Sequence, residues 1–135
     1  MLQPMTITKR NRFPKLSLNF TTMFKLEMGE FYLDAHEISN EELRVTCPAG
    51  DIPLLVPRTA HHRPDEKITH QAVLVLDENF SVNAQVQVLS CRRYSQQGFN
   101  VTFRITELSD QQQQDLEAFL SRAIEKNIPT ANVFG

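Results

Sequence analysis

Apolar and polar residues alternate along two long segments of this chain, a pattern typical of β-strands that bury one face. In residues 81–89 the apolar positions alternate with serine, asparagine and glutamine, and residues 99–105 repeat the pattern. The apolar positions are Val82, Ala84, Val86 and Val88 in the first segment and Phe99, Val101, Phe103 and Ile105 in the second. Because the sequence QQG between the segments favours a turn, residues 80–106 are predicted to form a hairpin.

Shorter segments upstream predict the rest of an antiparallel sheet. The sequences TTMFKLE and FYLDAHE flank Gly29 and predict a hairpin, and ELRVTCP predicts a further strand. Another strand in QAVLVLD is followed by a reversal at EN, just before residue 80. Between Pro48 and Lys67, four prolines and the sequence TAHHRPDEK predict a long surface connection with a short strand in IPLLV.

The spacing becomes helical after Leu108. Ser109 is a suitable N-cap with Gln112 three residues later, and an apolar stripe then continues to Asn127, before Pro129. The stripe consists of Leu116, Phe119, Leu120, Ala123 and Ile124. An amphipathic helix must cover an apolar surface, and the open end of a barrel is a suitable one. The fold is therefore predicted to be mainly β, with five to seven antiparallel strands in a closed or nearly closed barrel and one C-terminal helix.

The composition fits one domain. The chain has 135 residues, 41% hydrophobic and 22% charged, and no segment is long and apolar enough to cross a bilayer. No secretory signal pattern is present, so a cytoplasmic location is expected. We divide the chain into a basic arm at 1–15, a barrel domain at 16–128 whose helix covers about 109–127, and a tail at 129–135.

Motifs of common enzymes are absent, including G-x-G-x-x-G, the P-loop, G-x-S-x-G, H-E-x-x-H and C-x-x-C. His61 and His62 are adjacent, and neighbouring histidines meet one tetrahedral metal ion less readily than an i, i+2 or i, i+4 pair. Cys47 and Cys91 lie beside strand-like sequence, where a reduced core thiol is ordinary. We therefore expect a non-enzyme with no catalytic residue, metal ion or cofactor.

Charge is segregated along the chain although the net charge is only −2. The sequence TKRNRFPKL places four cations within seven residues, and no acidic residue precedes Glu27. Residues 27–42 then carry six acidic side chains and no lysine or arginine. A field divided in this way can position an anion or a partner.

The order of these segments resembles the PilZ domain family over nearly the whole chain: a basic arm ending in RFPKL, a hairpin, EISNEELRV, two further hairpins and GFNVTFRITELSDQQQQDLEAFL. PilZ domains are small bacterial six-stranded barrels with a C-terminal helix. Many are receptors for cyclic di-GMP (c-di-GMP), which they bind through an R-x-x-x-R loop before the first strand and a D/N-x-S-x-x-G motif on the barrel. The resemblance implies a six-stranded antiparallel barrel and c-di-GMP as a possible ligand.

Both binding motifs are degenerate here. The R-x-x-x-R loop falls on NRFPK, so that Asn11 and Lys15 replace the two arginines, with Arg10 and Arg12 beside them. Lysine offers a point charge instead of a planar fork that pairs bidentately and stacks.

The second motif falls on EISNEE, in which Glu37 replaces Asp or Asn, Ser39 is kept and Glu42 replaces glycine. A carboxylate at Glu42 would repel phosphates, and its Cβ would oppose a positive φ if the backbone needed one.

The favoured interpretation is a signalling module that couples c-di-GMP signalling to motility, pilus or surface behaviour, with weak or lost nucleotide binding and a role through protein partners. A functional receptor that uses Arg10, Arg12 and Lys15 is the alternative. A nucleic-acid-binding OB-like barrel, with Arg92, Arg93 and Tyr94 as contacts, is a further alternative that the pI of about 6.1 disfavours.

Overall fold

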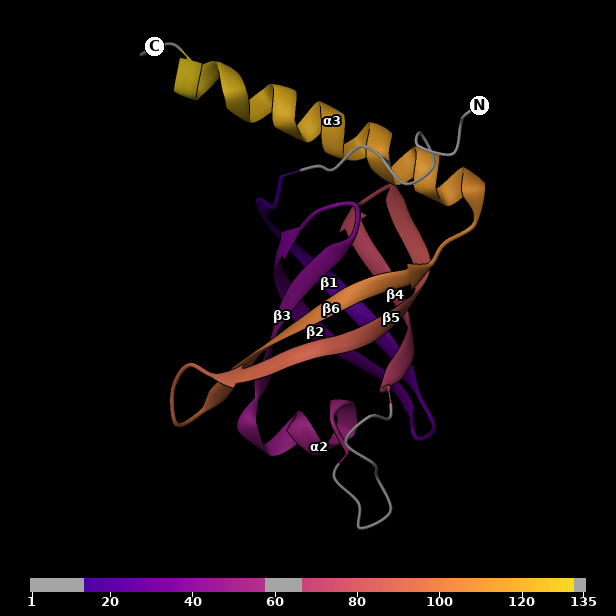
Figure 1. The fold of residues 1–135 in the computed structure, drawn as a ribbon, viewed down its shortest axis with the longest axis vertical. Coiled ribbons are helices and arrows are strands. Elements are labelled where there is room, and N and C mark those ends of the chain that lie inside the picture. Colours follow the sequence, from indigo (N-terminus) through magenta and orange to yellow (C-terminus); the bar gives the residue numbers. More distant parts are fainter. Residues whose placement is uncertain (1–13, 58–66, 133–135) are drawn as a thin grey trace, which may run out of the picture.

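The computed structural model describes residues 14–57 and 67–132, with side chains described as far as Lys126. Six strands, one short helix and one long helix make up the described part of the chain (Figure 1). The strands are β1 (Leu16–Leu26), β2 (Gly29–Ile38), β3 (Glu42–Pro48), β4 (Thr69–Asp77), β5 (Phe80–Arg93) and β6 (Gly98–Glu107). A 3-10 turn, η1 (Ala49–Asp51), leads into α2 (Ile52–Leu55), and α3 (Asp110–Asn132) follows the last strand.

The strands close into an antiparallel barrel in the order β1-β2-β3-β6-β5-β4, which confirms the predicted six-stranded barrel. β1 pairs with β4 from Thr21 opposite Val75 to Lys25 opposite Gln71, and this pairing joins the first strand to the last in the order. Closure gives every strand a hydrogen-bonded neighbour on both sides. The predicted hairpins β1–β2, β4–β5 and β5–β6 all form.

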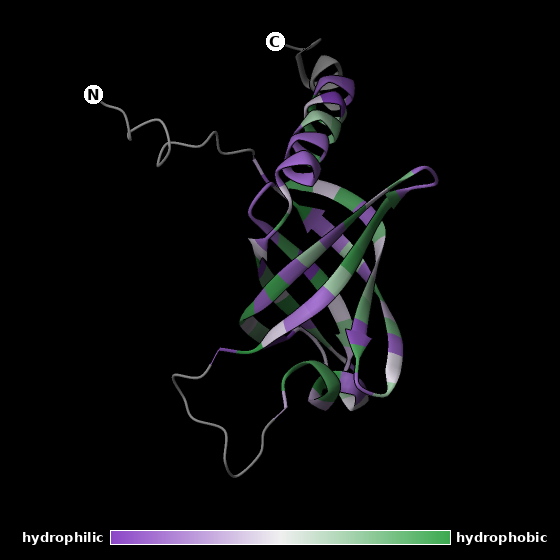
Figure 2. Ribbon diagram, turned by 90° about the vertical axis from the view of Figure 1, so that its right-hand side faces the viewer, coloured by the Kyte–Doolittle hydropathy of each residue, from purple (hydrophilic) through white to green (hydrophobic). Residues whose placement is uncertain are grey.

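Hydrophobic and hydrophilic residues alternate along the strands, as the colours of the ribbon in Figure 2 show, and the apolar side chains form the buried core. Val82, Ala84 and Val86 are buried from β5, and Val101 and Phe103 are buried from β6. Phe103 lies against Phe24 of β1 with ring centroids 5.2 Å apart, so the aromatic core joins strands far apart in the sequence.

The long helix α3 lies at one end of the barrel (Figure 1), as its apolar stripe predicted. Leu116 and Leu120 are fully buried, and the Phe119 ring stacks on Phe80 with centroids 5.3 Å apart. The Ser109 hydroxyl accepts a hydrogen bond from the Gln112 amide at 3.1 Å, which confirms the predicted N-cap.

The predicted end of this helix at Asn127 is wrong, because α3 continues to Asn132. A proline removes one backbone donor and disfavours the helical conformation of the residue before it, so the sequence predicts a boundary there. Near the end of a helix, however, a proline disrupts few of the backbone hydrogen bonds, so α3 continues past Pro129.

A second correction concerns residues 52–56, where a short strand was predicted and the helix α2 forms instead. Pro53 lies in the first turn of α2, where its missing N–H is not needed. Leu55 is fully buried, and its carbonyl accepts a hydrogen bond from His70 Nε2 at 2.8 Å. A closed barrel offers no edge for a seventh strand, so this apolar segment covers the core at the end opposite α3 (Figure 1).

Candidate functional site

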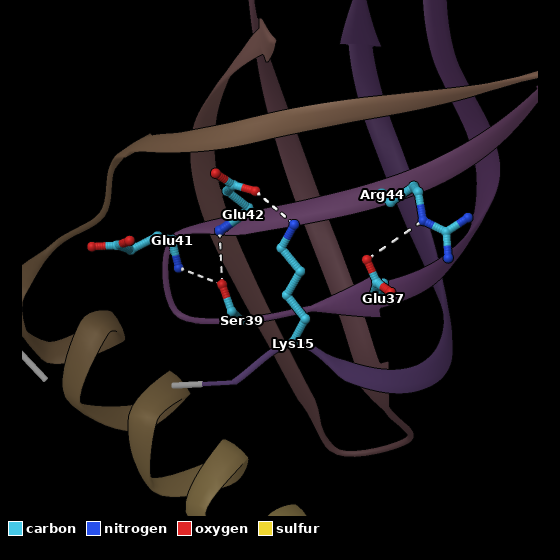
Figure 3. Close-up of polar contacts among 6 residues, drawn as sticks. All are labelled: Lys15, Glu37, Ser39, Glu41, Glu42 and Arg44. Carbon is cyan, nitrogen blue, oxygen red and sulfur yellow. Dashed lines mark hydrogen bonds and ion pairs between the residues drawn. The ribbon is translucent and has the colours of Figure 1, made fainter. Parts of the chain in front are cut away.

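The described members of the two degenerate motifs lie close together at the α3 end of the barrel (Figure 3). Lys15 immediately precedes β1, Glu37 lies near the end of β2, Ser39 directly follows β2, and Glu42 begins β3. Arg10, Asn11 and Arg12 lie outside the described residues. The fold thus brings the second motif next to the chain that leads out of the first.

A β-bulge in β2 sets which side chains meet at this site. Ala35 pairs with Val45 of β3, but the register then shifts by one residue, so that Glu37 pairs with Arg44 and not with Leu43. His36, in the bulge, is hydrogen bonded through Nδ1 to Asn19 Oδ1 at 3.1 Å and through Nε2 to the Thr46 hydroxyl. The bulge therefore turns Glu37 outward, opposite a cation.

Two ion pairs occupy the site. Lys15 Nζ lies 3.2 Å from Glu42 Oε1, and Arg44 Nε lies 3.5 Å from Glu37 Oε1 (Figure 3). Their side chains are between 29% and 55% exposed, so each pair contributes at most about 1 kcal/mol to stability. The ion pairs matter more for ligand binding, because a phosphate must compete with a carboxylate for each cation. Sequence reasoning missed Arg44, which only the pairing of β2 with β3 identifies.

Ser39, the position kept from the motif, is buried and hydrogen bonds with its own loop. Its Oγ accepts hydrogen bonds from the amides of Glu41 and Glu42 at 3.1 and 3.2 Å. Its own amide donates to the Glu42 carbonyl at 2.8 Å. These bonds form a tight turn between β2 and β3, so part of the hydrogen-bonding capacity of Ser39 is used to hold the backbone.

Glu42 does not strain this turn. Among the described residues, no residue other than glycine has a positive φ. The backbone objection to Glu42 raised from the sequence is therefore wrong for this conformation, because Glu42 opens β3 with ordinary strand geometry. The electrostatic objection is unaffected, since its carboxylate points to the Lys15 amine (Figure 3).

The same turn is attached to α3. Asn40 is buried, and its Nδ2 donates a hydrogen bond to Glu117 Oε2 at 3.3 Å. Gln113 donates to the same oxygen at 3.3 Å, and the Glu41 carbonyl accepts from the Ile105 amide at 2.7 Å. Contacts to both α3 and β6 therefore fix the turn between β2 and β3.

Little space remains among these side chains. The cavity lined by Lys15, Glu37, Glu42, Arg44 and their neighbours measures only about 10 Å³, which is about the room that one water molecule needs. A group larger than a water molecule could occupy this cavity only if the two ion pairs opened.

Other chemistry is sparse in the described part of the chain. No group of three or more His, Cys, Asp or Glu side chains there could hold a metal ion, and His61 and His62 lie outside it. Cys47 is buried, and burial, with smaller contributions from Asp51 and Cys91, raises the pKa of its thiol to about 12. A thiol so rarely ionised is a poor nucleophile. No helix in the described residues is long and apolar enough to span a membrane.

No family model matches this chain, and no curated protein matches its sequence. Solved structures do match. They include MotI, the inhibitor of motility of Bacillus subtilis, at 12% identity with a TM-score of 0.63 over 88% of this chain. The PilZ domain of YcgR from Escherichia coli with c-di-GMP matches at 12% identity and 0.58 over 92%. MrkH of K. pneumonia in complex with c-di-GMP matches at 16% identity and 0.67 over 87%.

These likenesses concern the fold, because the identities are low. The chain spans about half the length of MotI and of MrkH, at 52% and 53%, and 98% of the isolated PilZ domain of YcgR. The described barrel with its C-terminal helix is therefore a PilZ-type fold, and the resemblance inferred from the sequence is confirmed at that level.

Proposed function

We propose that this PilZ-fold chain is a non-enzymatic signalling module whose nucleotide site is closed by its own side chains, and which acts through protein partners. The observation that carries the proposal is the pair of contacts Lys15–Glu42 and Arg44–Glu37 around a cavity of about 10 Å³. A c-di-GMP molecule brings two phosphates. It would have to displace Glu42 from Lys15 and then lie beside that carboxylate.

The balance of interactions opposes binding. A ligand phosphate gains the attraction of Lys15 only after the existing pair is broken, and the released Glu42 carboxylate then repels it. Lysine also cannot supply the bidentate, planar contact that an arginine would make with phosphate and guanine. Arg10 and Arg12 would therefore have to provide most of the affinity of a functional receptor, the alternative form of the proposal.

Isothermal titration calorimetry with c-di-GMP tests this proposal. We expect no saturable heat up to about 100 μM ligand. The isolated PilZ domain of YcgR, solved with c-di-GMP, serves as the positive control. A micromolar affinity that is lost in Arg10→Ala or Arg12→Ala would refute the closed-site proposal and establish the receptor. Lys15→Ala further separates the closed site from the functional receptor. It should leave the titration unchanged if the site is closed and should weaken c-di-GMP binding if Lys15 contacts the ligand.

A further inference from the structure

A second surface, away from the candidate nucleotide site, carries both tyrosines of the chain. It is a groove of about 340 Å³ on the outside of the barrel, between β2 and the turn that joins β5 to β6. Its lining includes Tyr32, Asp34, Thr46, Pro48, Tyr94 and Gln97. Tyr32 is 58% exposed and Tyr94 is 56% exposed, and tyrosine is a residue type enriched at protein interfaces.

Tyr94 is exposed but held in place. Its amide donates to the Gly98 carbonyl at 3.1 Å, and its ring lies so close to Gly98 that a Cβ there would be 2.5 Å from the hydroxyl oxygen. Next to it, the Arg93 guanidinium lies 4.9 Å from the centre of the Phe99 ring and donates to the Gln96 carbonyl at 3.3 Å. The turn thus fixes the ring before any partner arrives, which lowers the entropic cost of binding.

The floor of the groove excludes one common way of binding a peptide. β3 pairs with β2 on one side, where Thr46 faces Asp34, and with β6 on the other, where Pro48 faces Gly98. The β3 backbone groups are engaged in the sheet on both sides, so an incoming strand finds no edge to extend along β3. Over this floor a partner must be recognised through side chains.

A polyproline II segment satisfies these conditions. Such a segment has no internal backbone hydrogen bonds and presents stiff, apolar proline rings and free carbonyls. Two tyrosine rings offer flat faces to the prolines, while the Tyr94 hydroxyl and the side-chain amide of Gln97 can donate to the carbonyls. Recognition of proline-rich segments by aromatic-lined grooves follows the same physical logic.

The charge of the groove adds a second requirement. Asp34 lies in the lining, and Glu30 accepts a hydrogen bond from the Tyr32 hydroxyl at 3.0 Å on the same strand. Two carboxylates on the β2 side favour a cation in the ligand. We propose that this groove binds a proline-rich segment of a protein partner, with a Lys or Arg of that segment against Asp34.

This surface is separate from the nucleotide site. Glu42 and Pro48 mark opposite ends of β3, about 20 Å apart at the usual rise per residue. The inference gives a chemical identity to the partner in the proposed function. It does not depend on the state of the nucleotide site, so a peptide experiment and a c-di-GMP titration can fail independently.

The test is a titration of the full chain with labelled ten-residue peptides, followed by fluorescence anisotropy and by amide shifts in NMR spectra. The probe consists of prolines with one central arginine. One control peptide has glutamate in place of the arginine, and another has glycine and serine in place of the prolines. We expect a dissociation constant on the order of 100 μM for the probe, about fivefold weaker binding for the glutamate peptide, and none for the glycine-serine peptide.

Variants locate the binding surface. Tyr32→Ala and Tyr94→Ala should each weaken binding at least fivefold, and Met28→Ala, which removes an exposed apolar side chain outside the groove, should have no effect. Tyr32→Ala is the decisive variant, because Tyr94 also packs on Gly98 and its loss could loosen the turn. Equal binding of all three peptides, no binding of the probe at 2 mM (about 20 times the expected dissociation constant), or equal effects of Tyr32→Ala and Met28→Ala would overturn the proposal.

Discussion

Restoring the two degenerate motifs should convert the closed site into a c-di-GMP receptor. The variant combines Asn11→Arg and Lys15→Arg with Glu37→Asp and Glu42→Gly. The first pair restores two planar guanidinium groups before β1. Glu42→Gly removes the carboxylate that now pairs with Lys15, and Glu37→Asp restores the shorter acidic side chain of the motif opposite Arg44. The barrel core is left unchanged, because the side chains of Lys15, Glu37 and Glu42 are partly exposed.

The size of the expected gain can be worked out from the contacts. Glu42 lies 3.2 Å from Lys15, so a phosphate held by the same cation would be roughly 6 Å from the carboxylate, a repulsion of about 3 kcal/mol at an effective dielectric constant of 20. Solvent exposure and salt reduce this to about half. Each charge-assisted hydrogen bond from a restored arginine adds about 1.5–3 kcal/mol. Lys15 already supplies a charge, so one new bond is counted, from the arginine that replaces Asn11. The total is then about 3–4.5 kcal/mol, an affinity gain on the order of a thousandfold.

Isothermal titration calorimetry of the wild type and the variant measures this gain. Glu78→Gly combined with Glu125→Gln, which removes two exposed acidic residues, one from the turn between β4 and β5 and one from α3, is the matched control for the change of +2 in net charge. Glycine at position 42 costs about 0.5–1 kcal/mol of stability, which a thermal melt monitors. If the melt is normal and the restored variant binds no better than the control, closure by these side chains is not what determines affinity.

Three further predictions test the fold and its surfaces. Leu120→Ala should lower the free energy of unfolding by about 2–5 kcal/mol in urea titrations, because Leu120 is fully buried between α3 and the barrel, whereas the exposed Gln114→Ala should stay within about 0.5 kcal/mol. Gly98→Ala should displace the Tyr94 ring and weaken binding of the arginine-proline probe about fivefold, with a melting temperature close to that of the wild type; unchanged affinity would contradict the account of the turn. The Cys47 thiol keeps its proton to about pH 12 in the folded state, against about 9.0 ordinarily, so its contribution to stability is complete below pH 9 and is lost as the pH rises toward 12. Between pH 7 and pH 10 the wild type should therefore lose about 1 kcal/mol more stability than Cys47→Ala, and equal losses would show that burial does not raise this pKa.

The sequence predicted the strands well because each buries only one face. Along β5 the alternation of Val82, Ala84 and Val86 with polar residues leaves only one orientation that buries the apolar side. The N-cap of α3 was equally readable, since Ser109 makes a local hydrogen bond to Gln112. Features that depend on residues only three or four positions apart can be predicted directly from the sequence.

The short helix α2 shows where this reasoning fails. Residues 52–56 are apolar and short, so their period does not separate a strand from a helical turn. What decides between them is the shape of the end of the barrel, where Leu55 fills the core and His70 Nε2 hydrogen bonds to its carbonyl. That environment is built by strands that follow α2 in the sequence.

The candidate site was also predicted only in part. The positions of Lys15, Glu37, Ser39 and Glu42 were predicted from the resemblance, but their partners were not. Arg44 meets Glu37 only because the bulge in β2 shifts the register by one residue.

By itself, the sequence determined the strand pattern, the capped helix and the loss of both arginines from the first motif, because each of these depends on the identity and local spacing of residues. Only the tertiary structure decided that Glu42 pairs with Lys15, that Asn40 is hydrogen bonded to Glu117 from α3, and that both tyrosines line one groove. The physical reason is that barrel closure and strand register bring together side chains that are distant along the chain, and no local pattern encodes which of them will meet.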